Sequence, residues 1–123
     1  MQTIRFGKTG FNVSRLGIGL SEIGSQLSVS DQDQATIMIN TALDSGINFL
    51  DTKAGHIALG AAGEEWTYQT VVDSIERSLR LLQTDHVDLV QLHSCGIDVL
   101  ERGDVIRALQ EAQDAGKTPF FGY

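Results

Sequence analysis

Short apolar runs alternate with longer stretches in which apolar residues return every three or four positions. The runs have the composition of buried strands, and the longer stretches are typical of amphipathic helices. We predict strands near residues 16–20, 47–53, 87–93 and 118–122. We predict helices near residues 31–44, 67–83 and 104–115. Strands that alternate with helices in this way predict an α/β fold with a parallel sheet and right-handed crossovers.

Local signals sharpen several of these boundaries. Residues 2–14 predict a β-hairpin, because two short β-prone runs flank a turn that contains Gly7 and Gly10. Ser30 and Asp33 have the spacing of a capping box at the start of the first helix. Thr67 is a suitable N-cap for the second helix. Each predicted helix has one apolar face. In the first helix it consists of Ala35, Met38, Ile39, Ala42 and Leu43, and in the second of Tyr68, Val71, Val72, Ile75, Leu79 and Leu82. In the third it consists of Val105, Ala108, Leu109 and Ala112.

Composition and charge narrow the functional classes. The 123 residues, 41% hydrophobic and 20% charged, suit one soluble domain over 1–123. A net charge of −7 disfavours binding to nucleic acid or to an anionic membrane surface. The single cysteine, Cys95, excludes an internal disulfide and fits a reducing compartment. With no apparent signal peptide or membrane span, we expect a cytoplasmic protein, and no Cys/His cluster predicts a metal site.

Three ionisable residues follow apolar strands. Asp51 and Lys53 end the 47–53 run, and His93 ends the 87–93 run. The carboxyl ends of parallel strands form the open face on which such proteins place their chemistry. A plainer interpretation stays open, because residues two apart on a strand face the same side and Asp51 and Lys53 can simply pair.

Most of the chain also resembles one protein family in its amino-acid sequence. The segment 74–93 runs from Ser74-Ile75-Glu76-Arg77 to Gln91-Leu92-His93. It resembles the third helix and fourth strand of aldo-keto reductases at almost every residue. Further similarity covers the family's opening hairpin and first strand, its first helix and second strand, and its approach to strand five, at residues 6–10, 13–17, 42–52, 115–117 and 121–123.

The resemblance implies a (β/α)8 barrel that reduces carbonyls with NADPH through an aspartate, a tyrosine, a lysine and a histidine. Asp51, Lys53 and His93 match three of these, and Gly19, Leu20 and Asp51 are the predicted cofactor-binding residues. The tyrosine has no counterpart, because Asp51-Thr52 runs directly into Lys53-Ala54-Gly55-His56. We interpret this as strand two joined to strand three, with a helix and a strand lost between them.

A full barrel of this type needs about 250 residues, and this sequence stops within what resembles strand five. We therefore predict a partial TIM-type barrel with an N-terminal hairpin, without the family's late phosphate-binding loops. One function is NADPH-dependent reduction of a small carbonyl substrate by hydride transfer, impaired by the missing tyrosine and phosphate-binding loops. The alternative is a non-catalytic half-barrel scaffold for association. Because a half-barrel exposes apolar surface, we expect a homo-oligomer or a part of a larger chain.

Overall fold

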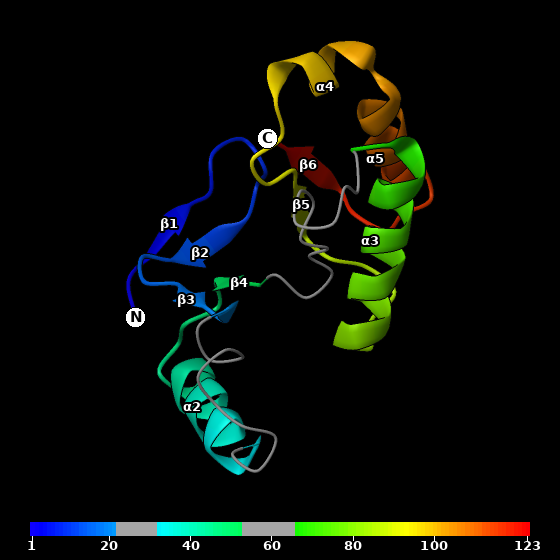
Figure 1. The fold of residues 1–123 in the computed structure, drawn as a ribbon. Coiled ribbons are helices and arrows are strands. Elements are labelled where there is room, and N and C mark those ends of the chain that lie inside the picture. The colour runs from blue at the N-terminus through cyan, green and yellow to red at the C-terminus, as the bar shows by residue number, and fades with distance from the viewer. Residues whose placement is uncertain (22–31, 53–65) are drawn as a thin grey trace. The chain divides into compact units, whose positions relative to one another are not determined.

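The computed structural model describes residues 1–21, 32–52 and 66–123. The chain divides into two compact units, Met1–Lys53 and Ala54–Tyr123. The described strands form three two-stranded sheets, one antiparallel and two parallel. The α/β class and the parallel pairing predicted from the sequence are confirmed (Figure 1).

The described part of the first unit contains a hairpin, a parallel strand pair and helix α2 (Gln32–Asp44). Strands β1 (Thr3–Arg5) and β2 (Asn12–Ser14) pair antiparallel, which confirms the predicted hairpin. Strand β3 (Ile18–Gly19) pairs in parallel with β4 (Leu50–Asp51), and helix α2 lies between them in the sequence. Both parallel strands are shorter than the predicted runs, because regular pairing covers only two residues of each.

Ser14 and Asn48 join the hairpin to the strand pair. The Ser14 amide donates to Asn48 Oδ1 over 2.7 Å, and the Asn48 amide donates to Ser14 Oγ over 3.1 Å. A nearby glycine allows close approach: a Cβ on Gly17 would lie 2.5 Å from Cδ1 of Phe49, well inside contact distance. These contacts hold the start of β4 against the run that leads into β3.

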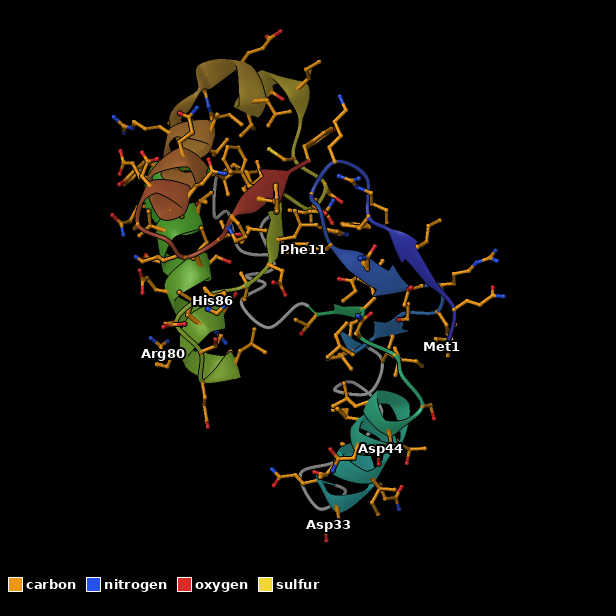
Figure 2. All side chains as sticks on the ribbon, turned by 180° about the vertical axis from the view of Figure 1, so that it is seen from behind. Met1, Phe11, Asp33, Asp44, Arg80 and His86 are labelled. Atoms are coloured by element: carbon orange, nitrogen blue, oxygen red, sulfur yellow. The ribbon has the colours of Figure 1, made fainter. Side chains whose placement is uncertain are left out.

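The apolar face predicted for α2 is only partly covered. Ala42 is buried, but Met38 is 51% exposed and Leu43 is 45% exposed. Periodicity identified the apolar face of this helix, but it does not indicate how much of that face is covered. Asp33 and Asp44 mark the two ends of the helix in Figure 2. The predicted partner of Asp33 in the capping box, Ser30, lies outside the described residues.

In the described part of the second unit, two long helices pack against each other and against a parallel strand pair. Its elements are α3 (Tyr68–Leu82), β5 (Leu89–Gln91), α4 (Ile97–Arg102), α5 (Asp104–Asp114) and β6 (Phe120–Gly122). Strands β5 and β6 are parallel and in register over three pairs. The core of this unit is formed by Val71, Ile75, Leu79, Leu92, Cys95, Val99, Val105, Ala108, Leu109 and Ala112.

The predicted helix patterns hold well in this unit. All four residues of the face predicted for α5 are buried. Thr67 caps α3, as predicted, in a capping box with Thr70: each hydroxyl accepts from the backbone amide of the other residue. Leu82 is exposed although it belongs to the predicted stripe, because it lies in the last turn of α3. Helix α4 was not predicted, since it is six residues long and lies between Gly96 and Gly103.

Candidate active site

The carboxyl ends of β3 and β4 bring together three predicted site residues. Gly19 is paired with Asp51 in the parallel register. The Leu20 amide donates to the Asp51 carbonyl oxygen over 2.8 Å. The Asp51 side chain is exposed, so its carboxylate is available at this strand end. Lys53, the third predicted catalytic residue, lies outside the described residues.

Gly19 also leaves open space beside this carboxylate. A Cβ built on Gly19 would meet no atom within 4 Å, in contrast to one built on Gly17. The backbone of this strand end is therefore accessible to a ligand, which is a common use of glycine next to a site.

His93 follows β5 in the second unit. Side chains alternate across a strand, and Val90 and Leu92 pack in the helix-facing core. His93 therefore faces the opposite side, and it is exposed. The Leu92 amide donates to the Gly122 carbonyl oxygen over 3.0 Å, which fixes the backbone immediately before His93 to the end of β6.

The residues after His93 form a tight corner. Ser94 has a positive φ of 56°, and its Oγ lies 3.3 Å from Nδ1 of His93. Cys95 then turns into the core, where burial raises the pKa of its thiol and the nearby Asp98 carboxylate adds to the effect. Sequence reasoning missed Ser94, because serine is not a residue type that signals a left-handed conformation.

Neither tyrosine offers a replacement for the one missing from the motif. The Tyr68 hydroxyl donates to a carboxylate oxygen of Glu111, and the Arg107 guanidinium lies 4.7 Å from the centre of the Tyr68 ring. The hydrogen bond to Glu111 raises the pKa of Tyr68, as do partial burial and the charge of Glu111, while Arg107 opposes this. A phenol held in this way bridges α3 and α5. Tyr123 follows β6, two residues after the core-packed Phe121.

The described helices do not fit the phosphates of a dinucleotide. A helix N-terminus binds phosphate when its amides are free and no acid competes. In α3 the Thr67 hydroxyl already accepts from the Thr70 amide, and the Tyr68 amide donates to Asp104. The first turns of the other described helices carry acids: Asp33, Asp98 and Asp104. Within the described ranges there is also no group of three or more His, Cys, Asp and Glu residues that could hold a metal.

Comparison with known proteins decides the family. The sequence profile of the aldo/keto reductase family matches residues 52–122, more than half of the chain. The chain belongs to the aldo/keto reductase family. It is 29% identical to L-galactose dehydrogenase from Arabidopsis thaliana over 94% of its length, and 26% identical to the aldo-keto reductase YhdN from Bacillus subtilis over 99%. In each case the match covers 46% of the relative, so the chain spans about half the length of these curated relatives.

Comparison with solved structures supports the same family. The holo form of aldo-keto reductase AKR11C1 from Bacillus halodurans matches with a TM-score of 0.80 and 27% identity, over 99% of this chain and 49% of that one. Glycerol dehydrogenase AKR11B4 from Gluconobacter oxydans matches with a TM-score of 0.74 and 25% identity, over 98% and 47%. The predicted partial barrel of this family is confirmed.

The matches with the curated relatives run over more positions than the chain has residues. They extend over 146 and 156 residues, whereas the chain has 123. The alignments must therefore open gaps in this chain, which is what an internal deletion produces.

Proposed function

We propose that this chain carries part of the carbonyl-reducing machinery of an NADPH-linked aldo-keto reductase that acts on small carbonyl compounds. The observation that carries the proposal is the exposure of Asp51 and His93 at the carboxyl ends of parallel strands. The carboxyl ends of parallel strands are where α/β barrels place their reacting groups. A reducing, cytoplasmic location is part of the proposal and accords with the single thiol of Cys95.

In this proposal His93 polarises the substrate. An imidazole N–H directed at a carbonyl oxygen stabilises the negative charge that develops there during reduction. Asp51 lowers the energy of the charged form of a neighbouring lysine, and Lys53 is the lysine closest to it in sequence. Since the family tyrosine has no counterpart, Lys53 or a water molecule supplies the proton to the product oxygen.

The described residues offer little for binding the phosphates of NADPH. The described helix N-termini do not fit its phosphates, and the net charge of −7 adds repulsion. The proposal includes weak binding: a fluorescence titration of NADPH against the purified chain should give a dissociation constant above the micromolar range. A tighter value would contradict the assignment of the phosphate site as missing.

Turnover of an aldehyde with excess NADPH tests the catalytic part. His93→Ala should lower turnover by about a hundredfold, the usual effect of losing a group that polarises or protonates the substrate. His86→Ala is the matched control, because His86 is an exposed histidine bonded to Asp85 before β5 begins. Equal losses in both variants, or no loss in either, would contradict the role of His93.

A second candidate function, association, is favoured by the exposed apolar surface of the first unit. Among its described residues only Ser14, Ala42 and Ile47 are buried, while Leu16, Met38, Leu43 and Leu50 are exposed. A second copy or another chain that covered these side chains would remove apolar area from water. Sedimentation should then show an oligomer, and a monodisperse monomer that unfolds cooperatively would count against this function.

A further inference from the structure

The corner after His93 contains a residue with an unusual backbone. Ser94 adopts a φ of 56°, one of two non-glycine residues with positive φ in the described part of the chain. For a residue with a Cβ this conformation costs on the order of 1 kcal/mol, and glycine would adopt it freely. Strained residues of this kind cluster at functional sites, where the surrounding structure holds them.

The conformation brings the Ser94 hydroxyl to its neighbour's ring. Oγ lies 3.3 Å from Nδ1 of His93, within hydrogen-bond distance. The residues on both sides of this pair are held in place. Before it, the Leu92 amide donates to the Gly122 carbonyl oxygen, and after it, Cys95 is buried in the core. The imidazole thus stands between two anchored segments, with the serine hydroxyl beside the ring nitrogen nearer the backbone.

We infer that Ser94 is a positioning residue, whose hydroxyl donates to Nδ1 of neutral His93 and keeps the ring proton on Nε2. A neutral imidazole carries one proton, and the hydrogen bond at one nitrogen selects the tautomer at the other. Nε2 is the nitrogen farther from the backbone, and with its proton it can donate to a carbonyl oxygen. The inference rests on the proposed role of His93 as the group that polarises the substrate.

The tautomer of His93 can be measured without substrate or cofactor. Nitrogen-15 NMR of the labelled chain, recorded well above the ordinary histidine pKa of about 6.5, distinguishes protonated from unprotonated ring nitrogens. His93→Gln and His86→Gln variants assign the signals. In the unsubstituted chain, His93 should show a protonated Nε2 and an Nδ1 shift typical of a hydrogen-bond acceptor.

Ser94→Gly removes the hydroxyl and keeps the left-handed backbone, so this variant should fold. The ratio of Nε2–H to Nδ1–H tautomers at His93 should fall by about threefold to tenfold, the size that one hydrogen bond supports. The matched control is Gln83→Gly. Gln83 has a φ of 53° at the end of α3, so this variant relieves the same backbone strain away from the His93 ring and should leave the ratio unchanged.

Each outcome of these NMR measurements supports or overturns the positioning role of Ser94. A mainly Nδ1–H tautomer in the unsubstituted chain would overturn the inference, and so would a ratio unaffected by Ser94→Gly. An equal change in the Gln83→Gly variant would assign the effect to stability and overturn it as well. The result is separate from the proposed function: if the tautomer behaves as stated but His93→Ala leaves turnover intact, the positioning stands and the reductase role fails.

Discussion

Leu109 provides a quantitative test of the packing that supports the His93 strand end. It lies in α5, it is 0% exposed, and it belongs to the core shared with α3. Leu109→Ala removes most of a fully buried side chain and leaves a cavity among residues that have little freedom to close it. Loss of buried methylene groups costs about 0.8 kcal/mol each. With the cavity, we expect a loss of about 3 kcal/mol in the free energy of unfolding, within the usual range for such substitutions.

The measurement has a natural probe and a matched control. Trp66 is the single tryptophan and packs against this core, so its fluorescence during urea unfolding reports on the Ala54–Tyr123 unit. Leu81→Ala makes the same chemical change on α3, where the side chain is 56% exposed. It should cost less than about 1 kcal/mol.

If the two variants differed by less than about 1 kcal/mol in unfolding free energy, the core described here would be wrong. A reduced slope of free energy against urea in the Leu109 variant would have a different meaning, a change in the surface exposed on unfolding. The comparison therefore uses both midpoint and slope. The burial of Leu109 follows from the packing of α5 on α3, so the test addresses the layer behind β5 and β6.

Two further predictions follow from titratable groups. The hydrogen bond and charge of Asp85 raise the pKa of His86 above 6.5, so this pair stabilises the fold fully below about that pH and less as pH rises through the raised pKa. A proton NMR titration should show this, Asp85→Asn should return the pKa toward 6.5, and an unchanged value would contradict the ion pair. Burial raises the pKa of the Cys95 thiol, so a disulfide reagent should react slowly with the folded chain and rapidly in urea. Rapid reaction of the folded chain would contradict the burial.

The sequence allowed the helix-facing core of the second unit to be predicted, but not the extent of burial in the first. Periodicity located Val105, Ala108 and Leu109 on one face of α5, and the structure buries all three. The same kind of pattern in α2 selected Met38, which is exposed. A stripe indicates which side is apolar; burial depends on what packs against it, and that information is not local.

The features at the strand ends were also only partly predictable from the sequence. That Gly19 and Asp51 share a strand edge could be predicted, because parallel strands align their carboxyl ends. The left-handed conformation of Ser94 could not, since it arises from the anchoring of Leu92 on β6 and of Cys95 in the core. Helix α4 was missed for a related reason: six residues are too few for a periodic signal.

The strand pairing indicates how an internal deletion after Asp51 would affect the predicted site residues. Within the described residues, β4 is paired with β3 at Asp51, and β5 is paired with β6 just before His93. Deleting a helix and a strand after Asp51 would therefore leave both ends intact and remove the tyrosine. It would also bring Lys53 within two residues of Asp51, where the family uses neighbouring strands. A lysine that close to a carboxylate in the sequence can pair with it, which stabilises the charged lysine and makes it a weaker proton donor.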